Sequence, residues 1–235
     1  MKKSYQFSII IGAYNQARYM ETLAKSLHDQ TVQDFEIHLC DDGSSDGTRE
    51  AFEKALHPLI RNTRYHYHRQ EQKGRRLARN WNQGITAAAG EYCVLMAGDS
   101  FLDERYLEVL QQFARPHRIL CGVRYQVHNG IGVDMDWRIT KGLIPLENVM
   151  LPAQPFNNIT GNGLTIPTAA FRAHGLIDEE ITGYGGEDNE IVGRLYYKGY
   201  VVFSLIDARL YHHWHPSSEM PNVKQVSAKV QSYAN

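Results

Sequence analysis

Residues 7–48 read FSIIIGAYNQARYMETLAKSLHDQTVQDFEIHLCDDGSSDGT, and this stretch decides the predicted fold. It begins with FSIII (7–11), a continuous apolar run of the kind found in a strand that is buried on both faces. Four apolar residues then recur at helical spacing, namely Met20, Leu23, Ala24 and Leu27. The segment FEIHLC (35–40) alternates apolar and polar residues, as a second strand does. A strand, a helix and another strand in this order predict parallel strands joined by a crossover helix.

The same alternation continues toward the middle of the chain. The further predicted elements are a helix that starts at Ser45 or Asp46 and ends near Pro58, a strand at 64–68, a helix at 77–88 before Gly90, a strand at 92–96 and a helix at 106–113. Residues 126–165 lose periodicity and gather Gly, Pro and Asn, which predicts a mobile, substrate-facing loop region. We therefore expect an α/β protein with a mostly parallel sheet and helices on both faces.

Composition and charge exclude several classes of protein. The 235 residues suit one large domain, and 43% hydrophobic with 22% charged residues is the balance of a globular protein. A formal net charge of −1 offers no electrostatic case for a nucleic-acid partner. The start, MKKSYQFSIII, is too short an apolar run for a signal peptide or a membrane span. We expect no transmembrane segment, which leaves peripheral association with a membrane open.

Three cysteines, Cys40, Cys93 and Cys121, are odd in number, widely spaced and set in apolar stretches. This pattern is typical of buried, reduced thiols rather than of a metal or redox site. A cytoplasmic protein is therefore expected, either free or at the inner face of the membrane.

The residues that follow the predicted strands indicate what kind of ligand binds. In open α/β sheets ligands bind beyond the carboxyl ends of the strands, and here those ends carry GAYN (12–15), DDGSSDGT (41–48) and AGDS (97–100). The first turn lacks the G-x-G-x-x-G of dinucleotide-binding proteins, and no G-x-x-x-x-G-K-[ST] phosphate loop occurs. Carboxylates at strand ends accept hydrogen bonds from a base or sugar, or hold a divalent cation that binds phosphate.

Four segments together resemble family 2 glycosyltransferases of the GT-A fold. Residues 8–48 resemble the start of that family, and KGRRLARNWNQGITAAAGEYCVLMAGDS (73–100) resembles its middle. YGGEDNEIVGRLYYKG (184–199) is similar to the Gly-Gly-Glu-Asp segment of its galactosyltransferase-type members, which bacterial chondroitin- and hyaluronan-type polymerases share. YHHWHP (211–216) is similar to the Tyr-His stretch that follows in them. The resemblance covers roughly residues 7–103 and 171–216, and it implies a single GT-A domain over residues 1–235.

The resemblance implies a set of donor-binding residues, namely Gly12, Ala13, Tyr14, Asp41, Asp42, Arg79, Gly98 and Asp99. Within this set Asp42 would contact the nucleotide base beside Tyr14, with Asp41 in support. Arg79, followed by Asn80, would neutralise diphosphate charge. Asp99 and His212 would hold Mn²⁺ or Mg²⁺. The sequence departs from the family at Ala97, where the family usually has the first Asp of its Asp-x-Asp motif.

The resemblance also assigns the catalytic base to Asp188. Inverting transfer needs a base that removes the proton of the acceptor hydroxyl while that hydroxyl attacks the sugar. Glu187 would bind sugar hydroxyls, and Gly185 and Gly186 would leave room for a sugar ring. A helix that begins at this pair would stabilise both carboxylates through its dipole.

Plainer interpretations of the same residues remain open from the sequence alone. Glu187 and Asp188 are also typical of helix-capping charges, and Asp41–Asp42 of a turn and helix cap. The histidines at 212, 213 and 215 also fit an exposed polar cluster, and Arg75 and Arg76 fit a solvated helix face.

The predicted function is transfer of a sugar from a nucleotide-sugar donor, UDP-linked by expectation, to a glycan or lipid-linked acceptor in polysaccharide or lipopolysaccharide synthesis. Residues 7–125 would form the nucleotide-sugar half, 126–216 the acceptor and catalytic half, and 217–235 a C-terminal tail. One alternative is a metal-dependent nucleotidyltransferase, although GAYNQAR lacks the triphosphate loop this needs. The other is a non-catalytic nucleotide- or glycan-binding protein, which Ala97 makes conceivable.

Overall fold

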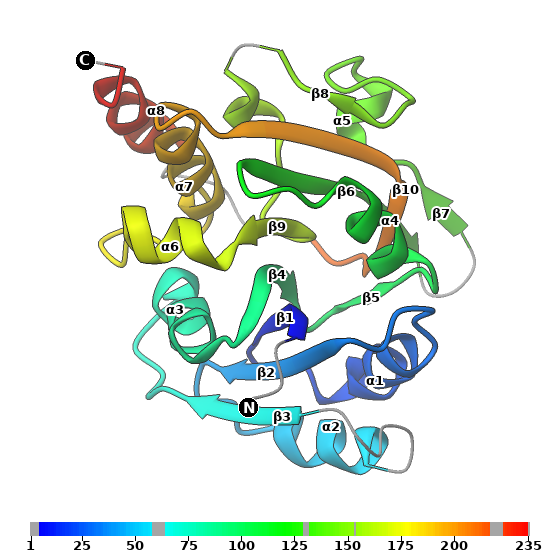
Figure 1. Cartoon of the computed structure of the whole chain (residues 1–235). Helices are drawn as coiled ribbons and strands as arrows, with labels where there is room; N and C mark the ends of the chain where they lie inside the picture. The colour runs from blue at the N-terminus through cyan, green and yellow to red at the C-terminus, as the bar shows by residue number, and fades with distance from the viewer. Residues whose placement is uncertain (1–4, 58–63, 129–131, 153, 217–222, 235) are drawn as a thin grey trace.

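The computed structural model of the chain describes residues 5–57, 64–128, 132–152, 154–216 and 223–234 (Figure 1). Its strands are β1 (Tyr5–Ala13), β2 (Phe35–Asp41), β3 (Arg64–Arg69), β4 (Gly90–Ala97), β5 (Ser100–Leu102), β6 (Arg118–His128), β7 (Gly132–Asp134), β8 (Val149–Met150), β9 (Leu164–Pro167) and β10 (Val201–His213). Its helices are α1 (Met20–His28), α2 (Thr48–Leu56), α3 (Leu77–Ala87), α4 (Tyr106–Phe113), α5 (Trp137–Thr140), α6 (Thr168–His174), α7 (Glu187–Tyr196) and α8 (Val223–Ser232), with 3₁₀ turns η1 (Ala17–Tyr19) and η2 (Pro155–Asn158).

One sheet runs through the whole molecule in the order β3-β2-β1-β4-β9-β6-β10-β5, and β7 and β8 pair with β6 and β10. Strands β3, β2, β1 and β4 are parallel, as the alternating strand and helix pattern predicted. Strand β9 is antiparallel to both β4 and β6, whereas β6 and β10 are parallel to each other. The predicted α/β fold with a mostly parallel sheet is confirmed.

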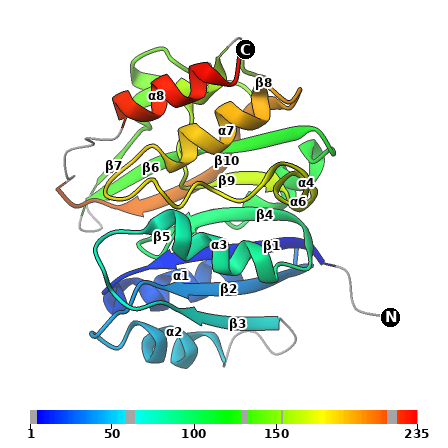
Figure 2. The same cartoon turned by 90° about the vertical axis from the view of Figure 1, so that its left-hand side faces the viewer.

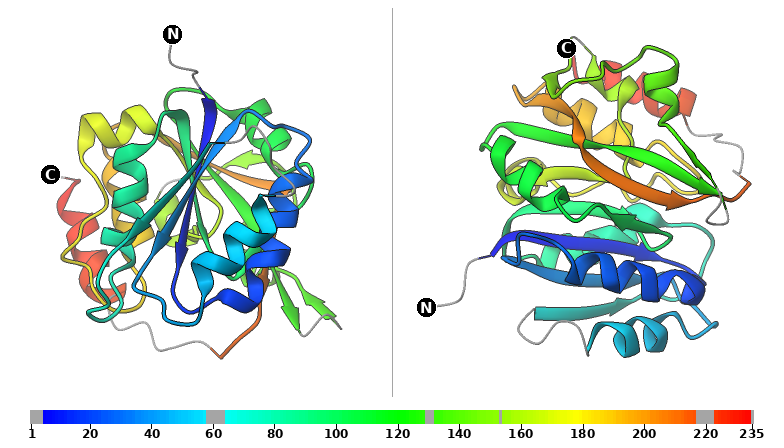
Figure 3. Two further views of the ribbon diagram at one scale, coloured as in Figure 1. Left: turned by 90° about the horizontal axis from the view of Figure 1, so that it is seen from below. Right: turned by 90° about the vertical axis from the view of Figure 1, so that its right-hand side faces the viewer.

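Helices cover both faces of the sheet, as Figure 3 (left) shows. Residues of α1, α2 and α4 pack with Phe7, Ile9 and Ile11 of β1 on one face. Residues of α3, α6, α7 and α8 pack with Ile10 on the other, which Figure 2 views from the front. Because successive strand residues point to opposite faces, a strand between two helical layers must be apolar at nearly every position. This is why FSIII is a continuous apolar run.

The periodic elements lie where the sequence predicted them, with two corrections at boundaries. Helix α2 begins at Thr48 after Gly47, rather than at Ser45 or Asp46. Gly90 does not stop α3; it is the first residue of β4. A Cβ there would lie 2.7 Å from the backbone of Phe7 and Ser8, so glycine allows β4 to pack closely against β1. The predicted helix end at Pro58 lies outside the described residues.

The predicted loop region at 126–165 is confirmed only in part, because short regular elements alternate with its turns and loops in the described ranges. It contains the end of β6, the short strands β7 and β8, helix α5, turn η2 and the start of β9. Strands of two to four residues are too short to show a period in the sequence, and pairing with β6, β10 and β4 creates them.

The predicted thiol state is confirmed, because Cys40, Cys93 and Cys121 are buried and unpaired. Burial raises the pKa of the Cys40 and Cys93 thiols to about 12, so both are protonated and unreactive at neutral pH. Among helices in the described ranges, none combines the length and the apolar character that crossing a membrane requires.

Candidate active site

A cleft of about 740 Å³ opens at the carboxyl ends of β1, β2 and β4. Predicted site residues that line it are Gly12, Ala13, Tyr14, Asp42, Asp99, Gly185, Gly186, Glu187, Asp188 and His212. Asp41, Arg79 and Gly98 are not among the described residues that line it. The fold thus gathers residues from both ends of the chain at the edge of the sheet where an open α/β fold binds its ligand.

The two aspartates at the end of β2 have different environments. Asp42 lies in the cleft wall, and its Oδ1 accepts a hydrogen bond from Nε2 of Gln70 at 2.6 Å. Asp41 is buried, where its Oδ1 accepts from the backbone N–H of Ser44 at 2.8 Å and its Oδ2 from the hydroxyl of Tyr67 at 2.7 Å. Asp41 therefore holds the turn that presents Asp42 to the cleft.

Helix α3 presents Asn80, rather than Arg79, to the cleft. Nδ2 of Asn80 donates to the carbonyl of Cys40 at 2.6 Å, while its buried Oδ1 has no hydrogen-bond partner among the described residues. Arg79 is exposed on another side of α3, because consecutive helical residues lie about 100° apart. Arg75 does line the cleft, and its guanidinium lies 4.3 Å from the ring centre of Tyr184.

A group of three possible cation ligands lies in the cleft. Oδ1 of the buried Asp99 lies 3.4 Å from Nε2 of His212. Its Oδ2 lies 3.3 Å from Nε2 of His215. Nδ1 of His212 lies 2.7 Å from Oε1 of Gln126, and Nδ1 of His215 lies 3.1 Å from the carbonyl of Pro216. If these acceptors hold a ring proton on Nδ1, each Nε2 is available to bind a cation beside the carboxylate.

This arrangement fits a divalent cation. Oδ1 of Asp99 is buried and has no hydrogen-bond partner within the described residues. Burial alone would raise the pKa of Asp99, yet His212 and His215 hold it well below its usual range. An ionised carboxylate next to two imidazole nitrogens is a set of ligands that can bind a divalent cation in place of the histidine protons.

Strand geometry explains which histidines join the group. His212 and His213 are consecutive in β10 and point to opposite faces, and His213 stacks on Tyr19 with ring centres 4.5 Å apart. His215 follows the end of β10 and turns back toward Asp99. From the sequence only His212 was predicted as a ligand. The alternation of side chains along a strand does not extend past its end, so it could not predict the direction of His215.

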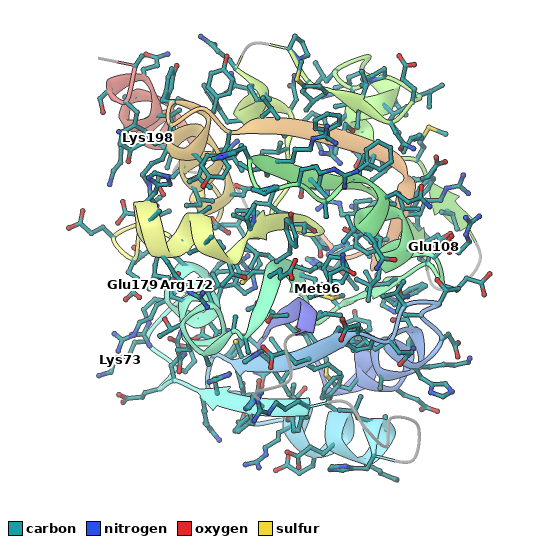
Figure 4. The ribbon with its side chains drawn as sticks, in the orientation of Figure 1. Lys73, Met96, Glu108, Arg172, Glu179 and Lys198 are labelled. Carbon is teal, nitrogen blue, oxygen red and sulfur yellow. The ribbon has the colours of Figure 1, made fainter. Side chains whose placement is uncertain are left out.

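Ala97, where the resemblance expected a carboxylate, lies next to the side-chain amide of Asn162. The backbone N–H of Ala97 donates to Oδ1 of Asn162 at 3.1 Å, and Nδ2 of Asn162 donates to Oγ of Ser100 at 2.6 Å. Asn162 also lines the cleft. The preceding Met96 is buried near the centre of the molecule, whereas Lys73 lies at its outer edge (Figure 4).

The Glu187–Asp188 pair begins α7 and faces the cleft. Oδ2 of Asp188 accepts from the backbone N–H of Gly161 at 2.7 Å, and Oδ1 accepts from the N–H of Asn189 at 2.9 Å. Gly186 caps the helix in the left-handed region, at φ 101°. The pair therefore supplies negative charge to the first turn of the helix and also lines the cleft, while Gly186 rather than either carboxylate is the cap.

Burial raises the pKa of both carboxyl groups of the pair. Burial raises the pKa of Glu187 to about 7, and the neighbouring charge of Asp188 adds to this effect. Burial also raises the pKa of Asp188, while the N–H groups of Asn189 and Gly161 oppose the rise. Because those hydrogen bonds stabilise its ionised form, Asp188 is a fixed and directed carboxylate at the cleft wall.

A buried ion pair holds the far wall of the cleft. Arg138 donates to both carboxylate oxygens of Asp136, at 3.0 Å and 2.6 Å, and to the carbonyls of Gly122 and Asn158. The same carboxylate accepts from the backbone N–H of Arg124 at 3.0 Å. Removing one partner of such a pair leaves an uncompensated buried charge, so it fixes this wall strongly.

The cleft residues that were not among the predicted site residues include Arg75, Arg124, Trp137, Asn162 and His215. Arg75 and His215 lie within the segments 73–100 and 211–216 that carry the family resemblance, but the sequence did not show that their side chains face the cleft. Arg124, Trp137 and Asn162 lie where the sequence lacks periodicity or alternates weakly, so no local signal marked them.

Comparison with known proteins identifies relatives of the chain. The family model described as Glycosyl transferase family 2 matches residues 8–173. The chain is 27% identical over 250 residues to Chondroitin synthase of Escherichia coli, covering 90% of this chain and 35% of that protein. It is 31% identical over 159 residues to Cholesterol galactosyltransferase of Borreliella burgdorferi, covering 66% of this chain and 41% of that protein. The chain thus spans less than half the length of both relatives.

A solved structure shows the same fold. S. aureus TarS 1-349 in complex with UDP superposes with a TM-score of 0.71 at 19% sequence identity, over 97% of this chain and 64% of that one. At this identity the likeness concerns the fold alone. The family model, in contrast, matches more than half of the chain. The chain therefore belongs to glycosyl transferase family 2.

Proposed function

We propose that the chain is an inverting glycosyltransferase that moves a sugar from a UDP-sugar to a hydroxyl group of a glycan or lipid-linked acceptor. The observation that carries this proposal is the composition of the cleft. It holds both an Asp-His-His group suited to a divalent cation and a directed carboxylate at a helix N-terminus. To break the bond between sugar and nucleotide, an enzyme must stabilise the negative charge on the departing diphosphate. It must also supply a base for the hydroxyl that attacks the sugar from the opposite side.

The donor would bind along the ends of β1 and β2. Tyr14 is 47% exposed in the cleft and offers a ring on which a base can stack. Asp42 would accept the ring N–H of uracil, and the unpartnered Oδ1 of Asn80 would accept from ribose or base. The relation to the fold of TarS, a structure of which holds UDP, supports a uridine nucleotide.

Asp99, His212 and His215 would hold Mn²⁺ or Mg²⁺. When bound, the cation offsets the negative charge that develops on the departing diphosphate. Arg75 and Arg18 also line the cleft and would contribute positive charge near the diphosphate. Arg79, the predicted cation, is exposed outside the lining, and Arg75 is therefore the stronger candidate for this role.

Asp188 would remove the proton from the acceptor hydroxyl. The backbone N–H groups of Gly161 and Asn189 hold its oxygens in place, so the carboxylate need not reorganise during attack. Glu187 would hydrogen-bond sugar hydroxyls beside it. Its raised pKa leaves a fraction of Glu187 protonated near neutral pH, so that it can donate as well as accept.

The acceptor would approach across residues 124–162. Trp137 is 44% exposed at the cleft and offers a flat face for a sugar ring, with Arg124 nearby in the lining. The similarity to a chondroitin synthase and a cholesterol galactosyltransferase supports a glycan or glycolipid as product. Transfer of galactose or a related hexose would match the galactosyltransferase-type segment at 184–199.

The proposal is tested by UDP binding and UDP release with and without Mn²⁺. We expect UDP to raise the melting temperature of the parent only when Mn²⁺ is present, and Asp99→Ala to abolish this rise. Asp103→Ala is the matched control, because Asp103 follows the same segment but does not line the cleft. The parent should also release UDP from one member of a panel of UDP-sugars when an acceptor is added.

Two results would contradict the proposal. If UDP stabilises Asp99→Ala as well as the parent, the cation site is assigned wrongly. If every UDP-sugar binds but none is consumed with any acceptor, the protein is a binding protein rather than an enzyme.

A further inference from the structure

A second group of metal-ligating side chains lies away from the cleft, between the edge strand β3 and strand β2. Glu36 and His38 alternate on β2 and therefore point to the same face, and His66 of β3 is paired with His38 in the sheet register. This face is covered by α3, where a Cβ on Gly84 would lie 3.2 Å from Cβ of His38. Glu36 lies near the start of β2, about 20 Å along the strand from Asp42.

The side chains of this group converge on one point. One ligand atom from each of Glu36, His38 and His66 lies within 4.8 Å of the others. Nε2 of His38 lies 3.0 Å from Oε1 of Glu36, and Nε2 of His66 lies 3.9 Å from its Oε2. The rings of His38 and His66 stack with centres 4.7 Å apart, and the Nε2 atom of each faces the carboxylate of Glu36.

The carboxylate of Glu36 has one satisfied oxygen and one that lacks a partner. Oε1 accepts from Oγ of Ser8 at 2.7 Å and from the backbone N–H of Ala89 at 2.6 Å, as well as contacting His38. Oε2 is buried and has no hydrogen-bond partner among the described residues. The Glu36 side chain is fully buried, and a buried carboxylate oxygen without a partner calls for a cation or a water.

We propose that Glu36, His38 and His66 form a Zn²⁺ site that ties the edge strand β3 to β2. One carboxylate oxygen and two imidazole nitrogens are ligands typical of Zn²⁺, with a fourth position left for water. His66 is the ligand nearest to solvent, with 36% of its side chain exposed, and it opens the path by which the ion enters.

The geometry requires only small movements. In a tetrahedral site with Zn–N bonds of 2.0–2.1 Å, neighbouring ligand atoms lie roughly 3.4 Å apart. The separation of 3.9 Å between Glu36 and His66 is close to that value, and rotation of the partly exposed His66 would close the gap. Thus the backbone of the two paired strands can stay in place.

His68 completes the site from outside the set of ligands. Its Nε2 lies 3.0 Å from Nδ1 of His38. Binding needs the Nε2 lone pair of His38, so the ring proton of His38 must sit on Nδ1, where Nε2 of His68 accepts it. Metal-bound histidines regularly donate their second N–H to such a partner, which fixes the tautomer and the ring direction.

The site is tested in an Asp99→Ala, His212→Ala background, which removes the cleft ligands and makes the result independent of the proposed function. After dialysis against Zn²⁺, this background should retain one Zn²⁺ per chain, measured by mass spectrometry. Saturation with Zn²⁺ should raise its melting temperature by about 5–10 °C. Adding His66→Ala, or Glu36→Gln as a nearly isosteric second variant, should weaken Zn²⁺ affinity by more than about 100-fold.

Two further variants test how Zn²⁺ affinity depends on histidines outside the set of ligands. His68→Ala should weaken Zn²⁺ binding by about 10–100-fold, as loss of an outer partner does. His28→Ala, at an exposed histidine of α1, should leave Zn²⁺ binding unchanged. The proposal is overturned if the background protein binds no Zn²⁺, or if the ion and its thermal shift survive in both His66→Ala and Glu36→Gln.

Discussion

Two neighbouring carboxylates, Glu187 and Asp188, show how surroundings separate residues of the same chemistry. Both are buried beside the cleft, and burial raises the pKa of each. Only Asp188 accepts a backbone hydrogen bond from a distant segment, at Gly161, and this bond both orients and stabilises its ionised form. The sequence placed the pair at the site, but the partner at Gly161 has no signal in the sequence.

The first prediction concerns Asp188→Asn. The amide keeps the size and its oxygen can still accept one of the two backbone hydrogen bonds, but the side chain cannot take a proton. We expect sugar transfer to fall by about 10²–10⁴-fold, the usual contribution of a general base. Binding of UDP with Mn²⁺, measured by calorimetry on the same sample, should stay nearly unchanged.

The control for this substitution is Glu180→Gln, because Glu180 is exposed in the loop before α7. It should leave transfer unchanged. Transfer by Asp188→Asn within a few-fold of the parent would remove Asp188 as the base and leave it a helix-capping role.

A second prediction concerns recognition of the base by Asp42. Uracil has a ring N–H at the position where cytosine has a lone pair, and a carboxylate can accept only from the former. Asp42→Ala should weaken UDP binding by about 1–3 kcal/mol and change CDP binding little. Calorimetric titration with both nucleotides in Mn²⁺ measures the difference.

Asp34→Ala is the control, since Asp34 is exposed before β2 and far from its carboxyl end. Equal affinity of the parent protein for UDP and CDP would show that Asp42 does not read the base.

At the scale of elements, α7 depends on α8 for its position. Val226 and Val230 of α8 are buried in the same core cluster as Ile191 and Leu195 of α7. A Cβ on Gly186, the cap of α7, would lie 2.7 Å from Cγ2 of Val226. The C-terminal helix therefore packs directly behind the turn that carries Glu187 and Asp188.

Gly186→Ala should therefore harm both stability and activity. The residue has φ 101°, which strains any L side chain, and the added methyl group would collide with Val226. We expect a loss of about 2–4 kcal/mol in the free energy of unfolding, the strain and the overpacking together, and a fall in transfer because the first turn of α7 shifts. Urea unfolding and a transfer assay on the same sample measure the two effects.

Gly199→Ala separates strain from collision. Gly199 has φ 88°, yet nothing lies within 4 Å of a Cβ placed there. This variant should lose about 1–2 kcal/mol of stability and keep its transfer rate. Equal effects of the two substitutions on transfer would show that contact with α8 does not position the site.

At the scale of the whole molecule, the cleft lies where two halves of the sheet meet. Strands β1, β2 and β4 supply the residues of the nucleotide side, and β10 supplies His212 from the other half. Strand β9 joins them, because it pairs antiparallel with both β4 and β6 (Figure 1). The site therefore exists only when the complete sheet has formed, and its buried carboxylates affect global stability.

The stability of the whole protein should depend on pH through Glu187. Its pKa rises from 4.5 to about 7 on folding, so the folded state binds the proton more tightly than the unfolded state. The free energy of unfolding therefore falls as pH rises from about 4.5 to about 7. Glu187→Gln lacks this loss and should gain up to about 3 kcal/mol relative to the parent between pH 5 and pH 8.

Urea unfolding at pH 5 and pH 8, without metal or nucleotide, measures this difference. Both proteins retain Asp188. Loss of the Glu187 charge also removes its repulsion of Asp188, and this too raises the stability of Glu187→Gln relative to the parent. A stability difference that is the same at both pH values would show that Glu187 ionises normally in the folded protein.

The sequence by itself determined the elements that carry their own signal. In these elements the spacing of apolar residues along the sequence reflects which residues are buried. They are FSIII, the alternating strand at 35–40 and the helices at 77–88 and 106–113. The parallel half of the sheet follows from their order, because short crossovers between parallel strands allow few arrangements. The resemblance of four motifs then sufficed to place Asp42, Asp99, Asp188 and His212, all of which line the cleft.

Only the tertiary structure decided which distant residues meet. His215 beside Asp99, Gly161 beside Asp188, Asn162 beside Ala97 and Arg138 beside the carbonyl of Gly122 each depend on pairing of β6, β9 and β10. Such pairing is stabilised by hydrogen bonds and burial shared over the whole sheet, so no local pattern encodes it. For the same reason the sequence did not indicate that Glu36, His38 and His66 form a group, because only the pairing of β2 with β3 brings them together.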